Sequence, residues 1–488
     1  MDKIKSYLSK VNNMTPAAKA SFWFIVSNIV LKGISFITTP IFTRLLDVAD
    51  YGVSNMFVTW EGIISIFATL SLSGGVYNVA MTKFEDDVDK VTSSMIGLTI
   101  CSSTVVYTVC IAINLLFPSL FELSTSYLVF MWVQTFFNAV TAFWLMRKRY
   151  IYDYKKVIAY TFSNAILSPV VAIIAVYLST ENKAYAKVIG SGLWPILIGF
   201  CIMLILVWKG KKLYHKEYWK FALKFNIPLL PHYLSSGAVG SVGKIMLNYF
   251  YDATYVGLYG IAGSITGLMS IVTSSINNAL IPQTLQSIKN GTIKELKKSI
   301  NIYLSLIVFM CCGILMFSRE AILILATPEY LDSIWFVAPL VLGTFTSFLS
   351  GILGNIVFYY EETKFMSYAT MVTAIANVVL NFIGLKLFGP YAVGYVSLIT
   401  NIIRFVMYYF TAKKFEKNLK DIVSLRFIVL MFLFLFVFML FSLIFWNNLI
   451  LKITILVIIS VLVLAFRKKI LSLLATMKKT GGERSDEQ

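Results

Sequence analysis

Residues Phe427–Phe445 have the sequence FIVLMFLFLFVFMLFSLIF, without a single charged side chain. A hydrophobic stretch of about 20 residues matches an α-helix that crosses the hydrocarbon core of a bilayer. Inside lipid every backbone N–H and C=O group needs an internal partner, and a helix supplies these partners within one segment. The stretch lacks the alternation of polar and apolar residues that marks a membrane β-barrel strand. It therefore predicts a transmembrane helix.

The rest of the chain follows the same pattern. Of its 488 residues, 58% are hydrophobic and 14% are charged, and the mean hydropathy is +0.78, which excludes a water-soluble fold of this length. The apolar segments predict an all-α integral membrane protein of about fourteen transmembrane helices. These are expected at 20–42, 53–79, 93–117, 125–146, 157–178, 185–208, 226–250, 257–281, 300–318, 334–359, 366–387, 391–411, 425–446 and 449–466.

Charge orients these helices. Placing the N-terminus in the cytoplasm puts most of the 42 Lys and Arg residues in cytoplasmic segments, as the positive-inside rule requires. This distribution explains the net charge of +18 without a nucleic-acid partner. We therefore expect a multi-pass protein of the cell membrane, with both termini in the cytoplasm. The five cysteines lie in apolar segments without C-x-x-C spacing, so no metal site or cofactor is expected.

A basic segment divides the chain near its middle. Residues Lys209–Lys224 (KGKKLYHKEYWKFALK) interleave lysines with aromatic residues, as an amphipathic segment on anionic headgroups does, although a solvated loop is the alternative. We take it as a linker between two halves. The predicted division is a six-helix lobe at 1–208, a cytoplasmic amphipathic linker at 209–225, a six-helix lobe at 226–412, and helices 13 and 14 with a cytoplasmic tail at 413–488.

A short motif occurs once in each half. Asp47–Gly52 (DVADYG) and Asp252–Gly257 (DATYVG) each follow one predicted helix and open the next, 205 residues apart. Six helices separate the copies, so both halves run in the same direction and form a parallel pseudo-repeat. Each motif is expected to turn the chain at the outer face. There the aspartate would accept hydrogen bonds from the backbone, and the glycine would adopt a left-handed conformation.

These residues resemble a known family. Thr39–Leu46 (TPIFTRLL) with Asp50–Gly52, and Ile227–His232 (IPLLPH) with Val256–Tyr259 (VGLY), look like polysaccharide flippases of the Wzx type. Those proteins belong to the multidrug/oligosaccharidyl-lipid/polysaccharide (MOP) exporter superfamily. The resemblance covers the chain in length, helix number and motif order. The family often has Asp-Arg in helix 7, where this sequence has Gly243-Lys244.

The resemblance implies a flippase that moves an undecaprenyl-pyrophosphate-linked oligosaccharide from the cytoplasmic to the outer leaflet by alternating access. The product would serve capsule, exopolysaccharide or O-antigen synthesis, and partners would be membrane lipids and the polysaccharide polymerase or assembly machinery. A lipid II flippase and a MATE-like drug antiporter are alternatives, and a membrane polymerase or glycosyltransferase is an alternative from a different class. An enzyme is not expected, because there is no P-loop and the longest predicted outer loop has no paired catalytic motif.

Charged residues inside the predicted helices are candidate substrate ligands. Lys32 lies mid-helix, too far from either end for its side chain to reach water, so it either pairs with Glu61 or lines a wet cavity. Lys244 and Arg404 lie nearer to helix ends, where reaching the interface competes with lining a cavity. A pyrophosphate needs such cations, because charge-assisted hydrogen bonds can replace its water. We assign Lys32, Lys244, Arg404 and Glu61 to the substrate cavity.

Three further groups of residues have candidate roles. Arg44, Asp47 and Asp252 form an outer gate or cap helix ends. Pro228, Pro231 and Gly237 form a hinge or a static kink in helix 7. Polar residues within spans would bind sugar hydroxyls or join helices; these are Asn28, Gln134, Asn138, Asn164, Asn277, Asn278, Asn355, Asn377 and Asn381.

Overall fold

The structure, a computed structural model, describes residues 16–448, 452 and 454. Ten helices in this part are long and apolar enough to cross a membrane, so the predicted all-α membrane class is confirmed. The count of fourteen stays a prediction, because helices α2, α3 and α10 are not among these ten and residues 449–466 lie almost entirely outside the described part. The α-helices are α2 (Pro16–Leu45), α3 (Val48–Ala68), α4 (Gly75–Lys83), α5 (Val88–Leu116), α6 (Thr125–Tyr150), α7 (Tyr154–Leu178), α8 (Lys183–Gly210), α9 (Lys216–Asn226), α10 (Leu230–Phe250), α11 (Ala253–Asn290), α12 (Ile293–Met316), α13 (Ser318–Leu325), α14 (Ile334–Tyr359), α15 (Thr363–Phe388), α16 (Ala392–Phe415), α17 (Leu419–Ile422) and α18 (Leu425–Ile444).

Two predicted helices differ clearly in length from the helices in the structure. The helix expected at 53–79 is wrong, because α3 ends at Ala68 and α4 starts only at Gly75. Leu70 and Ser71 between them have positive φ angles, which a right-handed helix cannot include. The helix expected at 257–281 is longer than predicted, since α11 continues through Pro282 to Asn290.

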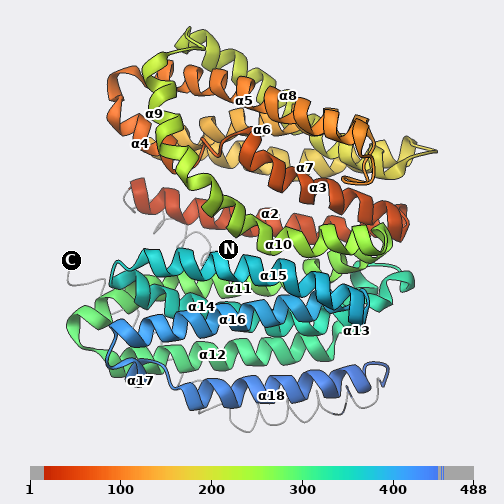
Figure 1. Ribbon diagram of the computed structural model, residues 1–488, viewed down its shortest axis with the longest axis vertical. Helices are drawn as coiled ribbons and strands as arrows, with labels where there is room; N and C mark the ends of the chain where they lie inside the picture. Colours follow the sequence, from red (N-terminus) through yellow and green to blue (C-terminus); the bar gives the residue numbers. More distant parts are fainter. Residues whose placement is uncertain (1–15, 449–451, 453, 455–488) are drawn as a thin grey trace, which may run out of the picture.

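The helices form two groups that lie side by side in Figure 1, one with α3 and α5–α8 and the other with α11–α18. Helix α2 packs on α7 of the first group, where α7 packs on α8 and α6 on α8. Helix α10 packs on α15 of the second group, where α15 packs on α16 and α14 on α16. These are the pairs that a parallel repeat predicts, with α10 as the counterpart of α2. The division of the chain at 208, 225 and 412 stays a prediction.

The two ends of this bundle differ. We call the end with Asp47–Gly52 and Asp252–Gly257 the motif end, and the opposite end, which carries α9, the linker end; they lie to the right and left in Figure 1. Across the group boundary α3 packs on both α10 and α11. Helix α3 is therefore the main contact between the two groups.

The linker helix α9 is docked on the protein. Tyr218 and Ala222 are buried against α4 and α5, and the Trp219 indole N–H donates to the Ser94 carbonyl at 2.9 Å. The Tyr218 hydroxyl donates to the Asp87 carboxylate at 3.1 Å. Hydrogen bonds from Lys90 and then Tyr218 hold the pKa of Asp87 below its usual range. The face of α9 that is left for contact with lipid headgroups is the opposite one, which carries the exposed Lys216, Lys220 and Lys224.

Candidate functional site

The two sequence motifs cap the helices that follow them. The Asp47 carboxylate accepts a hydrogen bond from the backbone N–H of Asp50 at 2.7 Å, at the start of α3. Asp252 accepts from the N–H groups of Thr254 and Tyr255 at the start of α11. Each aspartate thereby satisfies donors that the first helical turn leaves without partners.

The motif glycines have a different role from the predicted one. Gly52 and Gly257 do not have positive φ angles and lie inside the first turns of α3 and α11, so the expected left-handed conformation is wrong. Each is needed because the other helix is too close for a side chain. A Cβ at Gly52 would lie 1.7 Å from the Ala253 carbonyl oxygen, and a Cβ at Gly257 would lie 2.3 Å from the Val48 carbonyl oxygen. The two copies of the motif therefore pack against each other reciprocally.

Side-chain contacts extend this closure between the helix groups. The Thr43 hydroxyl donates to the Leu325 carbonyl at 2.7 Å, and the Tyr330 hydroxyl donates to the Asp47 carbonyl at 3.3 Å. Both bonds join the first half of the chain to α13 and the turn after it. The motif end is thus closed by contacts and hydrogen bonds that involve backbone atoms.

A lysine that we did not single out from the sequence lies beside this closure. The Lys187 ammonium donates to the Ser54 hydroxyl at 2.7 Å and lies 4.1 Å from the centroid of the Tyr51 ring, so α8 is tied to the first turns of α3. Arg44, by contrast, donates to the Pro40 carbonyl of its own helix at 2.8 Å. It caps the end of α2, and it makes no hydrogen bond or ion pair with a described residue across the motif end.

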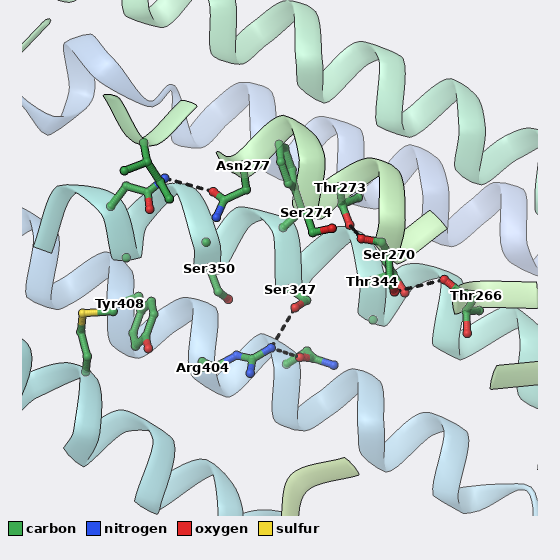
Figure 2. Close-up of a pocket in the computed structure, with 18 of the residues that line it drawn as sticks. Thr266, Ser270, Thr273, Ser274, Asn277, Thr344, Ser347, Ser350, Arg404 and Tyr408 are labelled. Carbon is green, nitrogen blue, oxygen red and sulfur yellow. Dashed lines mark hydrogen bonds between the residues drawn. The ribbon is translucent and has the colours of Figure 1, made fainter. Parts of the chain in front are cut away.

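A polar pocket lies within the second helix group, between α11, α14 and α16. Its volume is about 740 Å³, and its wall along α14 runs from Leu340 to Phe358, toward the linker end. Figure 2 shows hydroxyl groups from α11 and α14 together with Arg404 of α16. The amide of Asn355 donates to the Asn277 side-chain oxygen at 3.0 Å, so two of the predicted polar residues meet at this wall.

Among the described residues, Arg404 is the only Lys or Arg side chain that lines the pocket. Its Nη2 donates to the Ser347 hydroxyl at 3.0 Å and to the Asn401 side-chain oxygen at 2.5 Å. Its Nε is buried and has no hydrogen-bond partner, and in the described part of the chain no carboxylate lies within ion-pair distance of it. The pocket therefore holds a positive charge that no described carboxylate compensates.

The other predicted cavity residues are not gathered at this pocket. Glu61 lies in the first helix group, where its carboxylate accepts from Gln134 at 3.1 Å and from Asn138 at 3.3 Å. Among the described residues no cation is within ion-pair distance of Glu61, and the Lys32 side chain lies outside the described part. Lys244 is half-buried in α10 and is not part of the pocket lining.

The predicted hinge residues stand at the start of a helix. Pro228 lies in the 3-10 turn Ile227–Leu229, and Pro231 lies in the first turn of α10. Proline is tolerated there because first-turn N–H groups have no helical partner. The prolines thus begin α10 and do not bend its interior. Gly237 is exposed within α10, and a Cβ there would touch Ile66 at 3.3 Å.

The sequence analysis did not single out the hydroxyl residues that line the pocket. Thr266, Ser270, Thr273 and Asn277 recur every three or four residues in α11, which places them on one helix face. That periodicity was available in the sequence. It was obscured because single hydroxyl residues are common inside membrane helices, where they usually bond to their own backbone.

Comparisons with known proteins agree with this architecture. Residues 17–288 match the family described as polysaccharide biosynthesis protein. The chain is 22% identical over 411 residues to Lsg locus putative protein 1 of Haemophilus influenzae, covering 81% of this chain and 98% of that protein. Among solved structures it is similar to the lipid II flippase MurJ in an inward closed conformation, with a TM-score of 0.63, 18% identity, and coverage of 92% and 99%.

A second structural likeness is to an inward-facing multidrug resistance MATE transporter of the MOP superfamily. The TM-score is 0.56 at 15% identity, with coverage of 80% of this chain and 95% of that one. At such identities the structural likenesses establish the fold alone, and they confirm the predicted MOP fold. The family match covers more than half of the chain, and on that basis the chain belongs to the polysaccharide biosynthesis protein family and has the fold of the MOP superfamily.

Proposed function

We propose that the protein is a flippase that carries an undecaprenyl-pyrophosphate-linked oligosaccharide repeat unit from the cytoplasmic to the outer leaflet, for capsule, exopolysaccharide or O-antigen synthesis. One observation carries the proposal. A polar pocket with an uncompensated cation lies inside a bundle of membrane helices whose motif end is shut. A polar site within membrane helices is a functional site by default, because its charge is costly to bury in lipid.

The cations fit the head of such a substrate. A lipid pyrophosphate must pass through a region of low dielectric, where its charge would be very unfavourable without partners. In the proposed mechanism Lys32 and Lys244 donate to the pyrophosphate oxygens, and Arg404 contacts the sugar-bearing head from the second lobe. Glu61, held by two amide donors, keeps the first lobe polar without neutralising these cations.

Alternating access supplies the movement. The two lobes, 1–208 and 226–412, rock against each other, so that the motif end opens while the linker end closes. Asp47 and Asp252, as caps of the two contacting helices, would form the outer gate together with Arg44. The hinge would lie at Pro228, Pro231 and Gly237, just after α9, because α9 is fixed to the first lobe by Tyr218 and Trp219.

Two alternatives make different demands on the same site. A drug antiporter that binds organic cations needs an acidic pocket, whereas the described residues that line this pocket include a guanidinium and no carboxylate. A lipid II flippase shares the pyrophosphate and the fold, and the likeness to MurJ keeps this candidate in the test.

The test is a flipping assay with purified protein in liposomes. Fluorescently labelled undecaprenyl-pyrophosphate oligosaccharide is placed in both leaflets, and a membrane-impermeant quencher measures how fast the protected lipid becomes accessible. We expect flipping by the wild type, strong loss with Lys32→Ala, and normal rates with the control Arg426→Gln, which alters an exposed arginine in the first turn of α18. Lipid II is tested in parallel. Flipping of lipid II alone would replace the proposed substrate, and normal flipping by Lys32→Ala would exclude its assigned role.

A further inference from the structure

Most hydroxyl groups of the pocket have already used their hydrogens. Thr266, Ser270, Ser274, Thr344 and Ser350 each donate to a backbone carbonyl three or four residues earlier in the same helix, at 3.0–3.1 Å. A hydroxyl has one donor and two acceptor lone pairs. With the hydrogen directed at the helix, each of these oxygens presents only lone pairs to the pocket, as Figure 2 shows for their positions around it. The pocket wall is therefore rich in acceptors.

Arg404 supplies the charged donors of the pocket, and Asn277, Ser347 and Tyr408 add neutral ones. The Nε–H of Arg404 is buried, out of reach of a ligand, and its Nη2 is already shared between Ser347 and Asn401. Its Nη1, which makes no hydrogen bond to a described residue, is the charged donor group left for a ligand, beside a wall whose hydroxyls mostly accept. A ligand that satisfies the accepting hydroxyls and the guanidinium must donate hydrogen bonds at several points of its surface and accept strongly at one.

A pyrophosphate does not match this pattern. Its oxygens accept and carry negative charge, so most of the wall would repel them, and a single guanidinium would be left to compensate at least two charges. A metal ion or organic cation fits the lone pairs but is repelled by Arg404. A sugar ring fits both features, because its hydroxyls can donate to the wall while a substituent oxygen accepts from the arginine. The volume of about 740 Å³ lies within the range of small-molecule sites.

We infer that this pocket is a sugar subsite, separate from the place where the pyrophosphate binds, and that it takes a ring with a carboxylate or acetamido oxygen opposite Arg404. The inference deepens the proposed function and rests on it for the origin of the sugar. In this arrangement the ring hydroxyls donate to Ser270, Ser274 and Thr344, and the substituent oxygen accepts from the Nη1 group of Arg404. The pocket then helps to determine which repeat unit the protein accepts.

The test measures sugar binding directly. Saturation-transfer NMR is recorded on purified protein in lipid nanodiscs with free glucuronate, N-acetylglucosamine and glucose. We expect glucuronate, N-acetylglucosamine or both to bind more tightly than glucose, and the preference between the first two identifies the substituent. Arg404→Gln should weaken binding of the preferred sugar at least tenfold and leave glucose little changed. Thr344→Val, which keeps the shape but removes the lone pairs, should weaken all three.

Two controls make the outcome decisive. Arg426→Gln removes the same charge outside the pocket and should bind as the wild type does, and unfolding midpoints establish that each variant is folded. Absence of binding by all three sugars, or binding that Arg404→Gln leaves unchanged, would overturn the inference. The flipping assay is run separately. Normal flipping without sugar binding would refute the sugar subsite alone. Sugar binding by a protein that flips no lipid would refute the proposed flippase function alone.

Discussion

Substituting Gly52 by alanine tests whether the contact between the two motifs keeps the motif end shut. The new Cβ would lie 1.7 Å from the Ala253 carbonyl oxygen, which is 1.7 Å short of the 3.4 Å at which ordinary contacts begin. The obstacle is backbone, and it cannot rotate aside as the end of a side chain can. Helices α3 and α11 must therefore move apart at the motif end.

The magnitude follows from the cost of overpacking. Forcing a methyl group into a filled site typically costs about 1–3 kcal/mol. The closed state bears this cost and a state with separated helices does not. The equilibrium between closed and open motif ends should therefore shift roughly 5–150-fold toward the open form.

Distances between spin labels measure this shift. Labels are attached to cysteines replacing the exposed Glu181 and Glu329, one in each half of the chain at the motif end, in a background without the five native cysteines. Gly52→Ala should populate longer distances than the wild type. Gly263→Ala is the matched control, because it adds a methyl to α11 where nothing lies within 4 Å. An unchanged distance distribution in a folded Gly52→Ala protein would refute the view that this contact holds the closed state.

Three further predictions concern other contacts. Lys452 is almost fully buried and donates to both Glu320 carboxylate oxygens at 2.9 Å. Lys452→Met should therefore lower the free energy of unfolding by up to about 3–5 kcal/mol, less in so far as Glu320 reaches solvent, and adding Glu320→Leu should restore part of the loss. A thermal unfolding midpoint that does not fall in Lys452→Met would contradict a stabilising pair. The lowered pKa of Asp87 means that its contribution to the docking of α9 is complete above the usual pKa of 3.8 and is lost as the pH falls through the lower folded value. Hydrogen-exchange protection of α9 should drop over that acidic range in the wild type and depend less on pH in Asp87→Asn; equal pH dependence in the two proteins would exclude this carboxylate as the cause. Lys187→Met removes the bond to Ser54 and the contact with Tyr51, so the same spin-label pair should report a more open motif end, and a wild-type distance would show that Lys187 does not support the closure.

Much of the architecture was predictable because hydrophobicity along the chain is a local property. A segment such as Phe427–Phe445 has one stable structure in lipid, and α18 lies there. The break after Ala68 was not foreseen, since the apolar residues on both sides conceal two residues with positive φ angles. Helix ends depend on such backbone details more than on hydropathy.

The candidate site was predictable only in part. A charge inside a membrane helix stands out in any sequence, so Arg404 could be singled out before its pocket was known. The pairing of Glu61 with Lys32, one of two alternatives, stays a prediction, because the Lys32 side chain lies outside the described part; the bonds of Glu61 to the amides of Gln134 and Asn138 were not predicted. Amide donors carry no net charge, and their pairing with an acid depends on helix packing that a sequence does not display.

The sequence by itself determined that the chain crosses the membrane as helices, and that two related motifs stand at corresponding positions, because composition and repetition belong to the chain alone. Tertiary structure decided what those features do. Gly52 and Gly257 are glycines because two backbones meet there, and the pocket hydroxyls present acceptors because their hydrogens are used within their own helices. The first fact depends on the distance between two backbone segments far apart in the chain, and the second depends on the direction of each hydroxyl bond. Only the folded protein specifies these.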